Sequence, residues 1–383
     1  MSSVLLIFFV NALVFSILLF RTGLQRSSQS SKWLAAFIFL GALYVTPFMC
    51  GYGGWYSKTA YREFLFFMPM QQLFLIGPVF YFYVRSLLSP NYKISRKDLI
   101  HFLPAGVYLL YSLVVFITDK LILDEFYFYA DGKDKDLSVW YQVAGFFFML
   151  FYLILSLRHY RNYRKQSQEQ VSFADEIAFK WIEYFLIAFG TILTLRVLFF
   201  ILNPEWWNFG SKFWYYLCFS ILLYYITLRG YLTTMRFTER FSFYLTNDFQ
   251  TKQDQSVAAS SAEETSENID LNLWKSKISS HFSDLKLYTN PTLTLADIAS
   301  QLNTNRSLVS SVINQEFNMN FNDFVNKKRT EAVIEKLQAG EHRTSTLLGI
   351  ALDCGFNSKT TFNRAFKKHT GLTPKQFIDK NIA

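Results

Sequence analysis

Apolar residues gather in seven long runs along the first 231 residues of the chain, and most charged residues fall between these runs. A helix needs about 20 mostly apolar residues to cross the hydrocarbon core of a bilayer. The runs that approach this length are residues 4–20, 33–52, 64–84, 99–118, 139–157, 181–202 and 213–231. The pattern predicts a domain of seven transmembrane helices over residues 1–231.

The composition agrees with a membrane part. Of the 383 residues, 51% are apolar, 19% aromatic and 17% charged, whereas soluble domains carry about 25% charged residues. This balance excludes wholesale disorder and argues against an ordinary cytosolic enzyme. The first run has no basic residue ahead of it and no small-x-small site after it, so we expect a retained helix rather than a cleaved signal peptide.

Basic residues in the predicted loops indicate an orientation. Alternate loops hold 15 Lys and Arg on one side of the bilayer and 6 on the other. Cytoplasmic loops carry the excess of positive charge, so the first set is expected inside. With seven spans, the N-terminus then lies outside and the C-terminal part lies in the cytoplasm.

Few strongly polar side chains interrupt the runs. They are Asn11, Gln71, Gln72, His101, Glu183 and Arg196. An ionisable residue in a span is a candidate functional group, but His101 and Glu183 lie near the starts of their runs, and Arg196 is close enough to the outer end to snorkel. We therefore expect structural roles for these three. Pro69 and Pro78 bracket the two glutamines, and prolines in spans are tolerated or produce kinks.

Residues 232–270 join the spans to the C-terminal part. Residues 232–245 mix basic and aromatic side chains, as segments at a membrane surface do. Residues 246–270 are rich in Ser, Gln, Asn and acidic residues, so we predict a flexible linker. A chain of about 25 such residues has a mean reach of roughly 25–30 Å, which keeps the C-terminal part close to the membrane.

Residues 271–383 contain an internal repeat. Thr294 is followed by an apolar stripe at helical spacing, and the stripe returns 52 residues later after Thr346. The stripes are Leu295, Ile298, Ala299 and Leu302, then Leu347, Ile350, Ala351 and Cys354. Each leads through a short turn to a second helix, predicted over about 305–317 and 358–369. An entry helix is predicted over 270–287.

Helix ends repeat as well, 53 residues apart. Asn318 and Gly371 are residue types that stop helices in the left-handed conformation, and Asn320 and Thr373 are good N-caps. A joining helix is predicted over 321–337. The C-terminal part is therefore expected to fold as two helix-turn-helix units, which makes the whole chain all-α. A plain helical bundle is the alternative. It does not explain why the apolar stripes, the N-caps and the residues that end helices all repeat at nearly the same spacing.

The exposed faces of the two second helices carry hydrogen-bond donors. The first face holds Arg306, Ser307, Ser310, Ser311 and Asn314, and the second holds Lys359, Thr360, Asn363, Arg364, Lys367 and Lys368. Residues 271–383 hold 15 Lys and Arg against 9 Asp and Glu, which suits an anionic partner. These side chains fit phosphates and base edges of double-stranded DNA, with Arg364 suited to guanine and Asn363 to adenine. The serine-rich first helix is expected to read sequence more weakly.

Residues 355–374 are similar almost throughout to the signature of AraC-type transcription regulators, and residues 291–302 and 325–332 resemble the first unit and the joining helix of that family. The resemblance implies a DNA-binding domain whose second helices contact successive major-groove faces. It assigns base contacts to Ser307, Ser310, Ser311, Lys359, Thr360, Asn363 and Arg364, and phosphate contacts to Lys367 and Lys368.

Two departures from the family change the expectation. Family members often have an arginine where this chain has Ser311, so base readout by the first helix is expected to be weaker here. In the joining helix, by contrast, Arg329 stands where the family has an arginine. Typical members carry a soluble sugar-binding barrel. The seven predicted spans instead resemble the membrane-bound members of the family.

The sequence thus favours a sequence-specific transcription regulator in the bacterial inner (cytoplasmic) membrane. Its expected partners are double-stranded DNA and the lipid bilayer, with a homodimer as a candidate assembly and a signal ligand whose identity is open. The signal is expected to pass through residues 213–245 and the linker. The alternative is a transporter or channel with a DNA-binding regulatory tail, which would show several intramembrane charges or matching broken halves.

An intramembrane enzyme is the other alternative. The five histidines are scattered, and the sequence has no H-E-x-x-H, no G-x-S-x-G and no phosphate-binding loop. The three cysteines form no C-x-x-C pair. We therefore expect no enzyme activity, no cofactor and no metal site.

Overall fold

A computed structural model describes most of the chain, namely residues 1–89, 92–174, 180–202, 212–237 and 271–382. The described residues form helices and connections, with one isolated β-bridge and no β-strand among them. The all-α prediction is confirmed. The predicted juxtamembrane segment and linker lie outside the described residues from position 238 onward.

The chain divides into two compact units. Met1–Tyr160 and Lys180–Asn247 form the first, which we name the bundle unit, and Arg161–Phe179 and Asp248–Ala383 form the second, the tandem unit. The division cuts through one helix, because residues 161–170 of a helix that begins in the bundle unit belong to the tandem unit.

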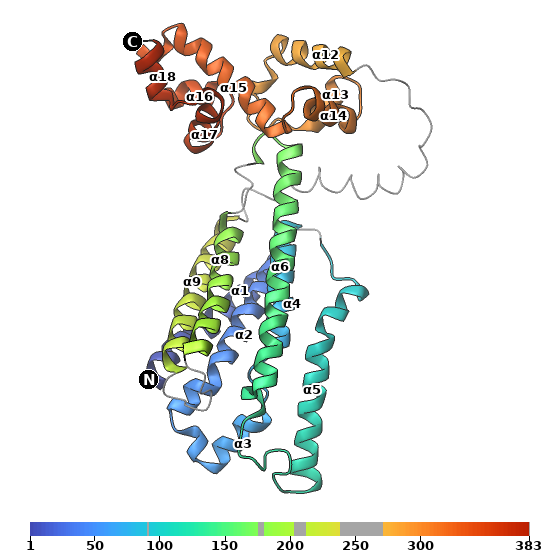
Figure 1. Cartoon of the computed structure of the whole chain (residues 1–383), viewed down its shortest axis with the longest axis vertical. Coiled ribbons are helices and arrows are strands. Elements are labelled where there is room, and N and C mark those ends of the chain that lie inside the picture. The colour runs from blue at the N-terminus through green and yellow to red at the C-terminus, as the bar shows by residue number, and fades with distance from the viewer. Residues whose placement is uncertain (90–91, 175–179, 203–211, 238–270, 383) are drawn as a thin grey trace, which may run out of the picture. The chain divides into compact units, whose positions relative to one another are not determined.

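Long apolar helices build the bundle unit (Figure 1). They are α1 (Ser2–Gln25), α2 (Gln29–Tyr52), α3 (Thr59–Phe67), α4 (Leu73–Leu88), α5 (Leu103–Phe116), α6 (Val139–Gln170), α8 (Lys180–Leu202) and α9 (Phe213–Phe237). Helix α1 packs along α2 and against α9, and α2 also packs against α4. Among the described residues, six helices are long and apolar enough to cross a membrane: α1, α2, the stretch Arg96–Ile122 that contains α5, α6, α8 and α9.

The surface of the bundle unit exposes large apolar side chains. Ile17, Leu110, Phe147 and Ile187 are each at least 60% exposed, and they lie on α1, α5, α6 and α8. A water-soluble bundle turns its apolar face inward and its polar face outward. Apolar residues on the outside of four helices fit contact with lipid tails.

The third predicted span is wrong as a single helix. Residues 64–84 divide between α3 and α4, which are separated by residues 68–72. Met68 is extended, with φ −95° and ψ 107°, because the following Pro69 disfavours helical geometry in the residue before it. Proline also has no N–H to continue a helical ladder.

Side chains from a distant part of the bundle unit satisfy the backbone at this break. The backbone N–H of Gln71 donates to Asp136 Oδ2 at 2.8 Å, and the N–H of Leu73 donates to Tyr141 Oη at 3.1 Å. Tyr141 in turn donates to the carbonyl of Gln71. The break between α3 and α4 is therefore stabilised by specific hydrogen bonds, which buried backbone groups need.

Arg196 lies inside the bundle unit, so the prediction that it snorkels is wrong. Its side chain is 5% exposed, and its Nη2 donates to Oε1 (2.6 Å) and to the carbonyl (2.8 Å) of Gln142. Gln142 Nε2 donates to Gln71 Oε1 at 2.6 Å and to the carbonyl of Asp136. A buried charge needs hydrogen bonds to offset its lost hydration; Gln142 accepts two from Nη2, whereas Nη1 has no hydrogen-bond partner among the described residues.

Two carboxylates lie buried in the connection that precedes α6. Asp134 accepts a hydrogen bond from Tyr56 Oη at 2.7 Å, and Asp136 accepts one from Tyr108 Oη at 2.5 Å. Burial raises the pKa of both carboxyls, and the charge of Asp136 raises the pKa of Asp134 further. This connection is therefore in part a packed layer of buried polar side chains.

Shorter helices build the tandem unit. They are α12 (Leu271–Asp284), α13 (Leu295–Gln301), α14 (Arg306–Glu316), α15 (Phe321–Gln338), α16 (Leu347–Asp353), α17 (Lys359–Thr370) and α18 (Pro374–Asn381). Helices α13 and α14 form the first helix-turn-helix unit, and α16 and α17 form the second. The 18 residues of α15, about 27 Å of helix, join the two units.

Each helix-turn-helix unit has its own hydrophobic core, and α15 contributes to both. Phe321, Phe324 and Val325 at its start lie in the core that α12, α13 and α14 share. Val333 and Leu337 near its end lie in the core of α16 and α17. Since interiors are close-packed, α15 fixes the spacing and the relative orientation of the two units.

Local signals place the helix ends of the tandem unit. Thr294 and Asp297 form a reciprocal capping box at the start of α13. Asn318 (φ 52°) and Gly371 (φ 76°) are left-handed after α14 and α17, as predicted. The entry helix is shorter than expected, because α12 ends at Asp284 and Lys286 turns left-handed at φ 47°.

Candidate nucleic-acid interface

Helix α14 presents a polar face opposite its apolar stripe. It is capped by Asn305, whose Oδ1 accepts from the backbone N–H of Leu308 at 2.8 Å. Its stripe of Val309, Val312 and Ile313 is fully buried. On the other face, Ser307 and Asn314 are exposed, and Arg306, Ser310 and Ser311 are half-buried. All five predicted residues of this helix therefore share one side of it.

Helix α17 presents a more basic face. Its N-cap is Ser358, and its stripe of Phe362, Ala365 and Phe366 is buried. All six predicted residues are exposed, namely Lys359, Thr360, Asn363, Arg364, Lys367 and Lys368. Long donors on an exposed helix face can reach base edges and phosphates when the helix enters a major groove.

Two of these cations interact with other parts of the tandem unit. Lys368 Nζ lies 2.7 Å from Asp323 Oδ2 in the first turn of α15, while 56% of the lysine side chain stays exposed. Burial, and then the positive charge of Arg164, lower the pKa of Arg364. The positive charge of Arg164, near the end of α6, therefore disfavours the charged form of this arginine of α17.

A buried arginine holds the two helix-turn-helix units together. Arg329 on α15 is 1% exposed, and its Nε donates to the carbonyl of Tyr288 at 2.9 Å. Its Nη2 donates to the carbonyl of Asn290 at 2.8 Å, and its Nη1 to Asn326 Oδ1 at 3.3 Å. The arginine of the joining helix therefore positions backbone rather than facing DNA, as expected of a charge that is buried and fully hydrogen-bonded.

The turn of the second unit packs against this arginine. Gly355 has φ +89°, and a Cβ at this position would lie 2.2 Å from the carbonyl oxygen of Tyr288 and 3.0 Å from Arg329 Nε. Only glycine combines this conformation with such a close approach. Asn303 holds the corresponding place in the first unit at φ 50°.

Sequence reasoning missed one contributor to the tandem unit. Residues 161–174, which we name the strap, comprise the end of α6 and the turn after it. The N–H of Ser172 donates to the carbonyl of Leu293 at 3.0 Å, and Val171 forms a β-bridge with Thr294. Asn322 Nδ2 donates to the carbonyl of Ser172 at 2.8 Å. In the sequence these residues appeared only as a basic loop, with no local pattern that marks the contact.

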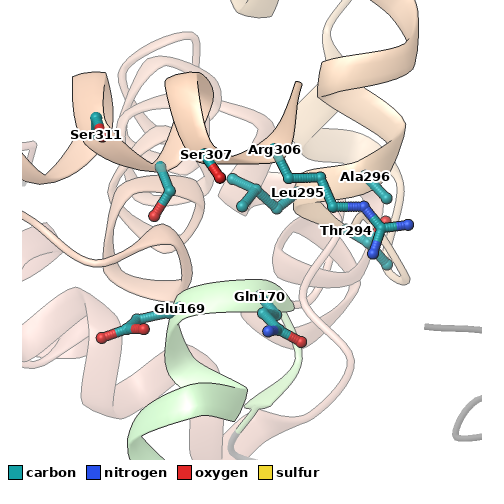
Figure 2. Close-up of a pocket in the computed structure, with 9 residues that line it drawn as sticks. Glu169, Gln170, Thr294, Leu295, Ala296, Arg306, Ser307 and Ser311 are labelled. Carbon is teal, nitrogen blue, oxygen red and sulfur yellow. The ribbon is translucent and has the colours of Figure 1, made fainter. Parts of the chain in front are cut away.

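The strap and the first helix-turn-helix unit enclose a hollow of about 270 Å³ (Figure 2). Glu169 and Gln170 line it from the strap, and Thr294, Leu295 and Ala296 line it from the start of α13. The remaining lining residues, Arg306, Ser307, Ser310 and Ser311, all belong to the predicted DNA-binding face of α14. In Figure 2, Glu169 and Gln170 lie across the hollow from Ser307 and Ser311.

Comparison with known proteins finds similarity within the C-terminal part of the tandem unit. Residues 298–380 match the family described as a helix-turn-helix domain. "Probable transcription factor PqrA" of Proteus vulgaris is 38% identical over 55 residues, which cover 14% of this chain and 43% of the relative. The chain thus spans less than half of the length of this curated relative. No solved structure matches the chain.

Proposed function

Because residues 298–380 form an AraC-type helix-turn-helix domain, we propose that the chain is a membrane-bound, sequence-specific DNA-binding regulator of transcription. The observation that carries the proposal is the pair of exposed polar helices, α14 and α17, held on separate cores at the two ends of α15. Two such helices on one rigid support suit two successive turns of a DNA major groove, about 34 Å apart.

In this proposal the two recognition helices have unequal roles. Asn363 and Arg364 of α17 read base edges, since Asn pairs with adenine and Arg with guanine in the major groove. Lys359, Thr360 and Lys367 add contacts on the same exposed face. Lys368 contributes less charge to phosphate than the sequence suggested, because it already pairs with an acidic neighbour.

The face of α14 would bind less selectively. Ser307, Ser310 and Ser311 are short and neutral, and the half-buried Arg306 is its one cation. Neutral hydroxyls donate single hydrogen bonds to bases or phosphates, whereas a bidentate pair gives about 1–3 kcal/mol of discrimination. Operators should therefore tolerate more variation in the half-site that α14 contacts.

The proposal places the bundle unit in the membrane with its N-terminus outside and the tandem unit in the cytoplasm. Two features support this arrangement. Six long apolar helices and the shorter apolar helix α4 together give the odd number of crossings that puts the two ends on opposite sides, and alternate loops hold the excess of basic residues. A signal received by the bundle unit would change its helix packing or its self-association, and thereby the availability of the recognition helices. A homodimer would present two tandem units to a longer operator.

A transporter with a DNA-binding tail remains the alternative. It requires a polar route through the bundle unit, whereas the amides of Gln71 and Gln142 are hydrogen-bonded to each other and to Arg196 Nη2. The hollow beside Arg196 has a volume of about 20 Å³, room for about one water molecule. This close packing around Arg196 favours a signal-sensing bundle over a transporter or channel.

The test is selection of DNA by the full chain in lipid nanodiscs. Fragments retained from a genomic library at moderate salt are sequenced, and the best is footprinted. We expect one bipartite motif, with two protected segments about one helical turn apart on one face of the duplex. Retention of fragments without any shared motif would overturn the proposal. Uptake assays on vesicles that contain the same protein test the transporter alternative.

A further inference from the structure

The strap is hydrogen-bonded to buried side chains of α15 within the tandem unit. Ser172 is 1% exposed and Asn322 is 4% exposed, and the amide of Asn322 donates to the carbonyls of both Val171 and Ser172. Arg329 Nη2 donates to Ser172 Oγ at 3.2 Å. Two polar side chains of α15, Asn322 and Arg329, therefore bind the strap.

From this anchor the strap runs along the predicted DNA-binding surface. Glu169 and Gln170 face Ser307 and Ser311 across the hollow in Figure 2, and Ser310 also lines it. Further back on α6, Arg164 is close enough to Arg364 on α17 to act on its charge. The end of α6 thus lies across the hollow from the predicted DNA-binding face of α14.

This position is incompatible with DNA in the major groove. The groove is about 12 Å wide and admits one α-helix, and a second helix about 10–12 Å in diameter has no room beside the exposed face of α14. Glu169 would also bring a negative charge towards the phosphates of the duplex. DNA can reach α14 only if the strap leaves.

From this geometry we propose that the strap is an autoinhibitory element, an intramolecular competitor that covers the predicted DNA-binding face of α14 until the bundle unit withdraws it. The inference rests on the proposed function, because it needs DNA as the ligand of α14 and α17. It adds a route for the signal: α6 is one continuous helix from Val139 in the bundle unit to Gln170 in the strap, so a shift or rotation of α6 in the membrane moves Glu169 directly.

The strap contact is weak enough to switch. The strap is held by one backbone hydrogen bond, from Ser172 to Leu293, by one isolated bridge and by the side-chain hydrogen bonds of Asn322 and Arg329. Elements that move in regulation are drawn from the least stable parts of a fold. If a DNA duplex binds only the released form, its apparent affinity is lowered while the strap is bound. The observed Kd is then the intrinsic Kd divided by the fraction of protein in the released form.

Release of the strap should therefore tighten DNA binding. The variant Val171→Asp places a charge where Val171 is buried beside Thr294, and Gln166→Asp places the same charge on the exposed side of α6 as the matched control. With the full chain in nanodiscs and the selected duplex, we expect Val171→Asp to lower Kd by about 5- to 150-fold, the usual range of allosteric coupling. Gln166→Asp should leave Kd within about twofold, which is well below that range.

A cross-link tests the opposite direction and remains informative if Val171→Asp misfolds. In the double variant Glu169→Cys, Ser311→Cys, a short bifunctional thiol reagent with a reducible bond should join the two residues that face each other across the hollow. We expect the linked protein to lose binding to the selected duplex and the reductant to restore it. The two single variants, treated in the same way, are the controls.

The outcomes separate this inference from the proposed function. If wild type selects DNA but Val171→Asp folds and binds with unchanged Kd, or the linked protein binds as well as the reduced one, autoinhibition is wrong and the regulator stands. If the cross-link does not form, the strap does not lie on α14 and the inference fails. If neither wild type nor any variant prefers a duplex, the proposed function fails first.

Discussion

Replacement of Gly355 by alanine tests how the two helix-turn-helix units are held together. Gly355 is left-handed at φ +89°, and an added Cβ would lie 2.2 Å from the carbonyl oxygen of Tyr288. That carbonyl accepts the 2.9 Å hydrogen bond from Arg329 Nε. A single methyl group therefore perturbs the turn of the second unit, the loop before the first unit and the arginine between them.

The expected cost has two parts. An L-residue in the left-handed conformation costs about 1–2 kcal/mol. The carbonyl of Tyr288 must also move away from the added methyl, which weakens a hydrogen bond to a charged group, a change of about 1.5–3 kcal/mol. Together they predict a loss of about 2.5–5 kcal/mol, a large share of the roughly 5–15 kcal/mol by which a domain is typically stable.

Gly371 provides the matched control. It is also left-handed, at φ +76°, but no heavy atom lies within 4 Å of the position its Cβ would take. Gly371→Ala should therefore cost only the conformational part, about 1–2 kcal/mol. The difference between the two variants isolates the contact with Tyr288.

Amide hydrogen exchange on the full chain measures both losses. Peptides from α15 and α17 report the free energy of opening of the tandem unit, while peptides from the bundle unit serve as an internal reference. We expect α15 and α17 to lose about 1.5–3 kcal/mol more protection in Gly355→Ala than in Gly371→Ala, the part assigned to the perturbed hydrogen bond. Equal losses in the two variants would refute the reasoning.

Three further predictions concern DNA contacts and pH. Arg364→Ala should weaken binding by about 1–3 kcal/mol and relax the preference at one base position; equal weakening on all sequences would make Arg364 a phosphate contact. Lys367→Ala should weaken binding evenly across sequences and reduce the slope of log Kd against log salt by about one, and an unchanged slope would contradict the phosphate role. Asp134→Asn should raise the melting temperature of the bundle unit at pH 8 but not at pH 4: burial raises the folded pKa of this carboxyl, so ionisation destabilises the folded state as pH rises above the usual value near 4. A gain that is the same at both pH values would contradict the titration of Asp134.

The tandem unit could be predicted from sequence because its signals are local. A capping box such as Thr294–Asp297 and a left-handed stop such as Gly371 lie within a few residues of the helix ends they determine. The repeat then confirmed each signal a second time. The same reasoning failed for the entry helix, where left-handed Lys286 ends the pattern early without a glycine or asparagine to mark it.

The bundle unit and the strap could be predicted only in outline, because their decisive contacts join distant residues. The break after Phe67 is stabilised by Asp136, 65 positions from the Gln71 that it contacts. Arg196 is held inside by Gln142 rather than drawn to the interface. The strap depends on Asn322, 150 positions from Ser172, and a side chain's partner at that distance has no signature in spacing or composition.

The most direct measurement of the central claim is the affinity of the nanodisc-embedded full chain for a selected duplex and for the same duplex scrambled, across a range of salt concentrations. A regulator with two recognition helices should bind the selected duplex at least about 1,000-fold more tightly than the scrambled one, and its affinity should fall steeply with salt. Equal affinity for both duplexes at every salt concentration would contradict the account.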